Sequence, residues 1–459
     1  MMRPFQLMRM GKIWMLLAWS LLLYLGLLAH SHLVLNPRRH NLKQVVPTSV
    51  PSQDVYQFLN LSEQECKDTF PDLTKDLDAT IALGPFTLKQ ANGKGPLQAR
   101  IKDGQLYIIH SEDKDSLSPE LLQTQQAALH QINRAIITSP EALPDTIFAL
   151  NVRDQPYGTA FSYSRPAYPA PASAMPPITR AFLMPHFAFW DWPLPSIGSI
   201  SRAAKAISRI EDTLPFARKD PRVVWRGSAR FNGAHNPTLR TGLLRIAAGA
   251  EWADVRALES YDVGASQGQE SRGEGEEARE GTANTTTLMI EDFCRYKYVL
   301  YTDGVTYSGR LPFHQMCGSV LLTPPLAWRQ LTTHLLQPVF SRDLFSHNQH
   351  TGSAGRGMLE GVRNAWPARY APEDANVVFV APDWSDLEDT VLWLENHPDI
   401  AAGIARRQRE LSVGRGYISP AMETCYWRAL LRGWSQVVRL EGEGWADEDG
   451  VSWEEFSIG

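Results

Sequence analysis

Short apolar runs that end in glycine or a charged residue recur along this chain, each followed by a pattern that favours a helix. Residues 222–228 (RVVWRGS) and 297–304 (KYVLYTDG) are two such runs, and residues 376–382 (NVVFVAP) precede a helix start at Ser385. Nearly continuous apolar strands of this kind are typical of parallel sheets covered on both faces. The sequence therefore predicts an α/β fold with parallel sheets.

The first part of the chain shows the same alternation. Residues 106–110 (LYIIH) and 147–154 (IFALNVRD) are predicted strands, and Ser118-Pro119 begins a helix between them. Residues 155–199 are rich in proline and aromatic side chains, which indicates an irregular, packed connection between domains. Two final helices are expected over 399–412 and 420–438. A chain of 459 residues is too long for one ordinary core, so we expect two domains.

The N-terminus contains a candidate membrane anchor. Residues 13–29 carry no charge and follow Arg3, Arg9 and Lys12. As a helix they would span about 26 Å, close to the thickness of an early secretory membrane. The pattern favours a type II signal anchor over a cleaved signal peptide, with a cytoplasmic tail 1–12, an anchor 13–30 and a stalk 31–58.

An anchor of this kind would place the rest of the chain in an oxidising lumen. Asn60 and Asn284 lie in N-x-S/T motifs and are predicted glycosylation sites. The four cysteines have no C-x-x-C spacing, and their even number suggests two disulfides, for which three pairings are open. A net charge of −5 gives no case for nucleic-acid binding.

The sequence offers no convincing metal site. Two Asp-x-Asp motifs, at 76–78 and 447–449, lie in polar or acidic surroundings rather than directly after a strand. His347 and His350 are more typical of a surface than of metal ligands. Residues 264–286 are charged, glycine-rich and of low complexity, and are expected to form a surface insertion without chemistry.

Polar residues and glycines at the predicted strand ends point instead to an anion. In open α/β sheets ligands bind beyond the carboxyl ends of strands, where glycine lets the backbone approach a phosphate and a guanidinium can hold two of its oxygens. A helix start near 308–310 would add backbone N–H donors. The candidate ligand-binding residues in these segments are Arg226, Gly227, Ser228, Arg240, Asp303, Gly304, Ser308, Gly309 and Arg310. The alternative for each arginine is a surface ion pair.

Asp154 is the complementary candidate, because it ends a strand in the other part of the chain. A lone carboxylate facing a cleft suits a general base that deprotonates a hydroxyl. The alternatives are a helix cap or an ion pair with Arg153.

At these residues the chain resembles glycosyltransferase family 90, which includes the Rumi-type protein O-glucosyltransferases and the fungal capsule-associated xylosyltransferases. The matching segments follow one another in the family's order over roughly residues 60–435: 151–154 (NVRD), 225–228 (WRGS), 294–322 (CRYKYVLYTDGVTYSGRLPFHQMCGSVLL), 377–394 and 424–427 (TCYW).

The resemblance implies a GT-B fold, in which two Rossmann-like domains face a central cleft. It assigns an acceptor-side domain to 59–205, a UDP-sugar domain to 206–410 and C-terminal helices with an acidic tail to 411–459. It also implies an inverting, metal-independent mechanism with Asp154 as the base and Arg310 on the diphosphate of a UDP-sugar. The family's cysteine pattern implies the disulfides Cys66–Cys425 and Cys294–Cys317.

We therefore expect a glycosyltransferase that transfers xylose or glucose to a glycan or glycoprotein, anchored in a Golgi or ER membrane. The anchor and the insertion depart from the Rumi-type members and favour a Golgi enzyme that builds a glycan. An anchored carbohydrate-binding or pseudo-enzyme subunit is the alternative from another class. A glycoside hydrolase is a weaker one, since no pair of carboxylates stands at strand ends.

Overall fold

The computed structural model describes residues 55–458, except for 92, 94, 169–179, 259–286, 346–359, 443–444 and 446–449. The described residues all belong to one compact unit, Gln53–Gly459. Several predicted features lie outside the described residues: the anchor 13–30, most of the stalk, the insertion 264–286, Asn284, both histidines of 347–350 and the motif at 447–449. Among the helices that are described, none is both long and apolar enough to cross a membrane. Asn60 is described and exposed, and its glycosylation stays a prediction.

A six-stranded sheet in the later part of the chain, here called the second sheet, is parallel throughout. Its order is β13-β14-β11-β10-β8-β9. The strands are β8 (Asp220–Gly227), β9 (Ala253–Ala257), β10 (Tyr296–Leu300), β11 (Val320–Thr323), β13 (Pro338–Phe340) and β14 (Val377–Phe379). The apolar runs at 222–228, 297–304 and 376–382 are therefore confirmed as parallel strands.

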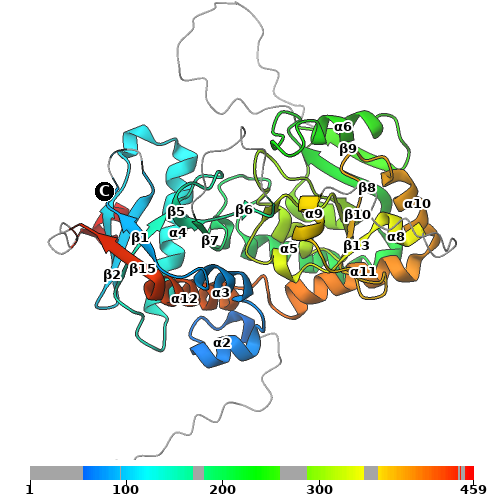
Figure 1. Cartoon of the computed structure of the whole chain (residues 1–459). Helices are drawn as coiled ribbons and strands as arrows, with labels where there is room; N and C mark the ends of the chain where they lie inside the picture. Colours follow the sequence, from blue (N-terminus) through cyan, green and yellow to red (C-terminus); the bar gives the residue numbers. More distant parts are fainter. Residues whose placement is uncertain are drawn as a thin grey trace, which may run out of the picture. The chain divides into compact units, whose positions relative to one another are not determined.

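Both faces of the second sheet are buried, which explains why its strands show no polar alternation. Val223 and Trp225 of β8 pack into one hydrophobic cluster, whereas Val224 between them packs into another. Helices α6 (Leu239–Ile246), α10 (Leu387–Asn396) and α11 (Pro398–Arg409) belong to this part, and Figure 1 shows them around the strands. Short helices α7 (Leu311–Gln315), α8 (Ser341–Phe345) and α9 (Glu360–Ala365) complete the connections.

The first sheet is mixed, which corrects the expectation of parallel sheets throughout. Its order is β16-β3-β2-β4-β5-β7, and of its neighbouring strand pairs only β4–β5 and β5–β7 are parallel. The strands are β2 (Leu97–Lys102), β3 (Gln105–His110), β4 (Thr146–Leu150), β5 (Thr159–Ser162), β7 (Arg180–Leu183) and β16 (Val451–Ser452). The cause is the two-residue turn Asp103-Gly104, with φ values of 51° and 73°, which joins β2 to β3 as a hairpin.

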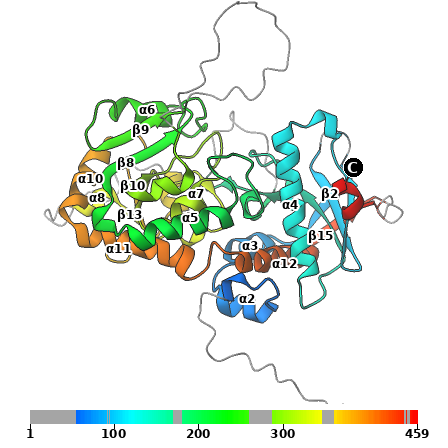
Figure 2. The ribbon, with the colours of Figure 1, turned by 180° about the vertical axis from the view of Figure 1, so that it is seen from behind.

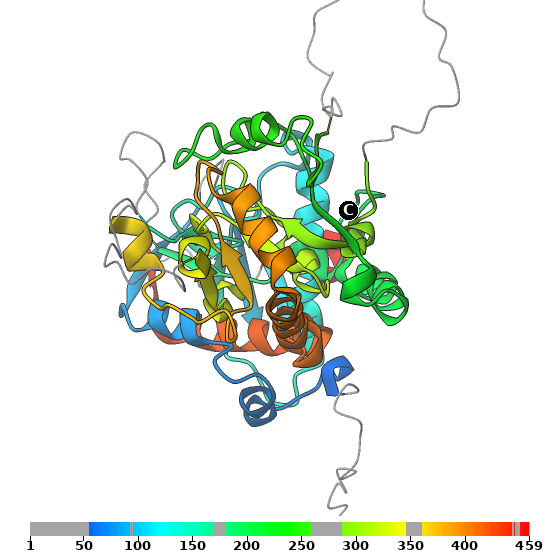
Figure 3. The ribbon, with the colours of Figure 1, turned by 90° about the vertical axis from the view of Figure 1, so that its right-hand side faces the viewer.

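Helices from both ends of the chain cover the first sheet. The predicted helix after Ser118 is α4 (Pro119–Ile137), and the Ser118 hydroxyl accepts a hydrogen bond from the Leu121 N–H. α12 (Pro420–Val437) contacts α4, α2 (Glu63–Thr69) and α3 (Lys75–Ile81). Figure 2 shows α4 and α12 from behind, and Figure 3 shows the blue α2 below the orange-red α12. A helix near the C-terminus therefore packs against the first α-helices of the described chain.

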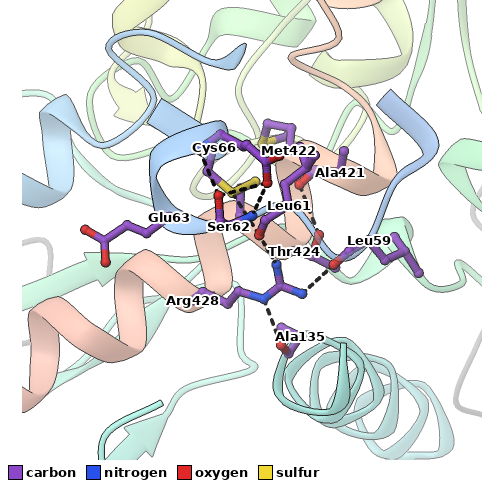
Figure 4. The surroundings of a disulfide bond; sticks show 12 residues. Leu59, Leu61, Ser62, Glu63, Cys66, Ala135, Ala421, Met422, Thr424 and Arg428 are labelled. Carbon is purple, nitrogen blue, oxygen red and sulfur yellow. Dashed lines mark hydrogen bonds between the residues drawn. A yellow bond between two sulfur atoms is a disulfide. The ribbon is translucent and has the colours of Figure 1, made fainter. Parts of the chain in front are cut away.

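The disulfide Cys66–Cys425 fastens α2 to α12, as the cysteine pattern predicted. One turn along α12, the buried Arg428 donates to the carbonyl oxygens of Leu61 and Ala135 at 2.9 Å each, and to that of Leu59 (Figure 4). Backbone carbonyls thus satisfy a charged side chain that would otherwise be costly to bury. The second predicted disulfide, Cys294–Cys317, is also present.

Short pairings join the two sheet regions. β6 (Arg165–Pro166) is antiparallel to β12 (Trp328–Arg329), and Asp76 of α3 forms ion pairs with Arg165 and Arg329 at 3.1 and 3.3 Å. The remaining elements are β1 (Phe86–Lys89), which pairs with β15 (Val438–Glu441), α5 (Ile200–Thr213), which contacts α7, and the terminal α13 (Trp453–Ile458). Asp76 is thus an ion-pair partner of two arginines that belong to the paired strands β6 and β12.

Candidate active site

The strand order of the second sheet creates one natural ligand position. From β8 the chain crosses to β9 on one side, and β10 then forms the other neighbour of β8. Where the order reverses in this way, the loops after the two strands diverge and leave a crevice at their carboxyl ends. The loops that leave β8 and β10 begin at Ser228 and Tyr301, which are the two segments that the sequence selected.

A pocket of about 480 Å³ lies at this position and is called the strand-end pocket below. It brings together eight of the ten predicted residues: Asp154, Gly227, Ser228, Arg240, Gly304, Ser308, Gly309 and Arg310. Its other lining residues are His186, Phe187, Trp192, Phe231, Leu258, Val305, Thr306 and Tyr307. Asp154 comes from the loop after β4 of the first sheet, so both sheets contribute to one site.

Arg310 lies at the pocket without an acidic partner among the described residues. Its Nη1 donates to the carbonyl oxygen of Arg226 at 2.5 Å, which fixes the guanidinium but leaves its charge uncompensated. Burial, with a further effect of the Arg240 charge, lowers the pKa of Arg310 to about 10. A buried cation in this state is stabilised by an anion that enters the pocket.

Arg240 on α6 connects the two strand-end loops. Its Nε donates to the carbonyl oxygen of Asp303 at 3.2 Å and its Nη1 to that of Ser228 at 3.0 Å. Burial lowers the pKa of Arg240, although Tyr301 and Asp303 act in the opposite direction. A β-carbon at Gly304 would lie 3.4 Å from the Arg240 Nη2, so glycine leaves this guanidinium room beside the loop.

The helix start contributes less than the sequence suggested. α7 begins at Leu311, and Arg310 is its N-cap residue. The N–H of Leu311 already donates to the Ser308 carbonyl oxygen at 3.3 Å, and Pro312 has no N–H. An anion at this edge would therefore be bound by the guanidinium groups more than by the end of α7.

Two predicted residues do not line the strand-end pocket. Arg226 is buried, and its Nη2 donates to both carboxylate oxygens of Asp254 at 2.9 and 3.0 Å. Its charge is therefore compensated by a residue of the neighbouring strand β9. The prediction that the Arg226 side chain binds the ligand does not fit this geometry.

Asp303 turns away from the strand-end pocket into an adjoining cavity of about 270 Å³. Its carboxylate accepts hydrogen bonds from the Ala327 N–H at 2.9 Å and the Tyr301 hydroxyl at 3.2 Å. Burial raises the pKa of Asp303 to about 7 despite these bonds. The adjoining cavity lies at the ends of β11, β13 and β14, and Gly304 borders both spaces.

Asp154 is accessible from the strand-end pocket, and its surroundings suit a base. Tyr307 donates a hydrogen bond to its carboxylate, and the Thr306 hydroxyl donates to its backbone oxygen at 3.1 Å. Burial raises the pKa of Asp154, and the Tyr307 hydrogen bond opposes that shift. The alternative ion pair with Arg153 is wrong, since Arg153 binds Glu112 at 2.9 and 3.0 Å.

Sequence reasoning missed the aromatic side of the pocket. His186, Phe187 and Trp192 belong to the proline-rich segment that was interpreted only as a connection. Tyr307 lies inside the selected loop but was not chosen, because its hydrogen bond to the distant Asp154 has no signal in the sequence. Within the described ranges, no group of three or more His, Cys, Asp or Glu side chains is arranged to hold a metal ion.

Comparison with known families adds an independent observation. The model of glycosyl transferase family 90 matches residues 61–341, which is more than half of the chain. The chain belongs to glycosyltransferase family 90. The match contains every residue of the strand-end pocket, from Asp154 to Arg310. No similar sequence was found among curated proteins.

Membership of family 90 confirms the resemblance and supports a transferase that uses a sugar donor and an acceptor. The mixed α/β architecture with several sheets is consistent with a glycosyltransferase fold. The strand-end pocket is therefore the candidate active site of this family 90 protein.

Proposed function

We propose that this family 90 protein is a metal-independent, inverting glycosyltransferase that transfers xylose or glucose from a UDP-sugar to a hydroxyl of a glycan or glycoprotein. The observation that carries the proposal is the opposition, in one pocket, of a carboxylate of raised pKa and two guanidinium groups, of which that of Arg310 has no acidic partner among the described residues. The two sheet regions would be the two domains of a GT-B fold, with boundaries near 205 and 410.

The reaction follows from the two charged groups. Asp154 takes the proton of the acceptor hydroxyl, whose oxygen attacks the anomeric carbon from the face opposite UDP. The bond between the anomeric carbon and the diphosphate oxygen breaks, and UDP leaves with the electron pair. Arg310 and Arg240 stabilise the charge that develops on the diphosphate, a role that a metal ion has in other enzymes.

The neutral polar groups of the pocket position the diphosphate. Among the described residues, the Ser228 hydroxyl forms one hydrogen bond, which it accepts from the Arg230 N–H at 3.3 Å, so its own proton would be available to a phosphate oxygen. Gly304 and Gly309 allow the backbone to approach the ligand closely. The adjoining cavity has room for the nucleoside, and Asp303 and His235 lie in its lining.

We also propose a lumenal catalytic part in a Golgi or ER membrane, anchored by residues 13–30. The two disulfides support an oxidising compartment, and the exposure of Asn60 is compatible with glycosylation there.

The test is release of UDP by the detergent-solubilised full-length protein from UDP-xylose, UDP-glucose and other UDP-sugars, with EDTA present. We expect release from at least one donor, increased by added acceptor. Complete dependence on Mn²⁺ would overturn the metal-free mechanism. UDP binding without any transfer would instead indicate a pseudo-enzyme, and no response to nucleotide would indicate a carbohydrate-binding subunit.

A further inference from the structure

His186 has a fixed backbone position at the strand-end pocket, just before the short helix η3 (Phe187–Phe189). The Nε2 of Gln131 on α4 donates to the carbonyl oxygens of His186 and Phe187, at 3.1 Å each. Trp427 of α12 in turn donates to the Gln131 Oε1 at 3.0 Å. Gln131 and Trp427 are fully buried, so two packed helices hold the histidine in place.

The tautomer of the His186 ring follows from its neighbour. The backbone N–H of Ala188 donates to the His186 Nδ1 at 3.1 Å, so Nδ1 carries no proton. A neutral imidazole has one N–H, which must then be on Nε2. Burial lowers the pKa of His186 to about 3, so the ring stays neutral at the pH of any secretory compartment. His186 therefore presents one fixed, uncharged N–H donor.

This donor lies between the two charged sides of the pocket. A β-carbon at Gly309 would lie 2.4 Å from the His186 Nε2, so Nε2 faces the residue just before Arg310. On the other side, the ring centroids of His186 and Tyr307 are 5.8 Å apart, and Tyr307 is the hydrogen-bond donor to Asp154. Among the described residues, no acceptor is found for the Nε2 proton.

We infer that the His186 Nε2–H donates a hydrogen bond to a hydroxyl oxygen of the transferred sugar and helps to select that sugar. This inference rests on the proposed function, which requires the anomeric carbon to lie between the acceptor oxygen at Asp154 and the diphosphate at Arg310. The sugar ring must then pass His186. A neutral donor matches a neutral hydroxyl, whereas the arginines match the phosphate charge.

The inference is tested on the full-length protein with the preferred UDP-sugar and analogues that each lack one sugar hydroxyl. The unaltered protein should use one deoxy analogue about tenfold to a hundredfold less efficiently in kcat/KM than the parent donor. His186→Phe should lose a similar factor on the parent donor and no longer distinguish it from that analogue. His186→Asn, which keeps an N–H donor, should retain part of the discrimination.

His130→Phe is the matched control, because His130 stacks on Trp190 with ring centroids 4.4 Å apart and does not line the strand-end pocket. It should leave the ratio between parent and deoxy donors unchanged. The affinity for UDP alone, measured by calorimetry, should be the same in H186F and the unaltered protein, which also shows that the variant folds.

Two results would overturn the inference. One is an H186F variant that loses activity with all donors by the same factor and keeps the discrimination. The other is a weaker affinity of H186F for UDP alone, which would place the contact on the nucleotide. Failure of the proposed function is distinguishable, because the unaltered protein would then release no UDP from any donor.

Discussion

The two charged sides of the strand-end pocket are built differently. The carboxylate side, Asp154, lies in a loop after β4 of the mixed first sheet, is reached by solvent and is held by one tyrosine hydroxyl. The arginine side, Arg240 and Arg310, lies at the carboxyl edge of the parallel second sheet and is bound to backbone carbonyls. On each side, burial disfavours the charged form of the functional group. A bound ligand would therefore stabilise that charged form more than the protein does.

A neighbouring buried arginine lies in a different electrostatic environment. Arg226, in the same strand end, has its charge compensated by two hydrogen bonds to Asp254. Arg310 donates to the carbonyl oxygen of that same Arg226. Two arginines that touch each other thus have opposite roles, one in the fold and one in the pocket, and the position of a single aspartate distinguishes them.

The change with the largest expected effect should abolish the function of the carboxylate side and leave that of the arginine side intact. Asp154→Asn removes the base but keeps the size of the side chain, so transfer should fall by about 10² to 10⁴-fold. The affinity for UDP should change little, because the arginine side is intact. Initial rates of UDP release with acceptor present, together with calorimetric titration of UDP, measure the two quantities.

Asp78→Asn is the control for this change. Asp78 is the exposed member of the Asp76-Leu77-Asp78 motif and accepts a hydrogen bond from the Thr74 hydroxyl. Its replacement should leave transfer unchanged. A D154N variant that transfers at a normal rate would remove Asp154 from the chemistry.

The next effect concerns binding on the arginine side. Arg310→Ala should weaken UDP binding by about tenfold to a hundredfold, since a charged hydrogen bond contributes about 1.5–3 kcal/mol and each 1.4 kcal/mol is tenfold. The affinity of Arg310→Lys for UDP should lie between those of R310A and the unaltered protein, because an ammonium keeps the charge but loses the planar fork of the guanidinium. Calorimetry with UDP measures all three proteins.

Arg245→Ala provides the matched control, since Arg245 is exposed on the same helix as Arg240. It should bind UDP like the unaltered protein. Equal losses from R245A and R310A would mean that general positive charge attracts the nucleotide, and the distinction between the two sides of the pocket would then fail.

Much of this arrangement could be predicted from the sequence because it is local. Continuous apolar runs identified β8, β10 and β14, and Ser118-Pro119 marked the start of α4. The rule that ligands bind at strand ends selected eight residues that the fold brings into one pocket. The hairpin between β2 and β3 was also readable, because Asp103-Gly104 is a strong turn signal that was not used.

The other features of the site depend on which residues lie opposite one another in the folded chain, and the sequence alone does not show this. The compensation of Arg226 follows from the register of β8 against β9, where Arg226 pairs with Arg256 and Asp254 lies two residues earlier. The direction of Asp303 is set by the Ala327 N–H, which belongs to a distant loop. The His186 ring packs against Gly309, which lies in a distant segment of the chain. None of these contacts can be predicted from the residue pattern of the segment that contains it.

The smallest expected effect is a pH dependence confined to the carboxylate side. Burial raises the pKa of Asp154 above its ordinary value of 3.8, and a base must be ionised to accept a proton. Transfer should therefore be constant above the raised pKa and fall by about tenfold for each pH unit below it. The residual activity of D154N should lack this decline. Asp303→Asn removes the carboxyl of the adjoining cavity, whose pKa burial raises to about 7, and should preserve the decline. A decline that disappears in D303N instead would assign the titration to the adjoining cavity and show that Asp154 is not the group that limits the rate.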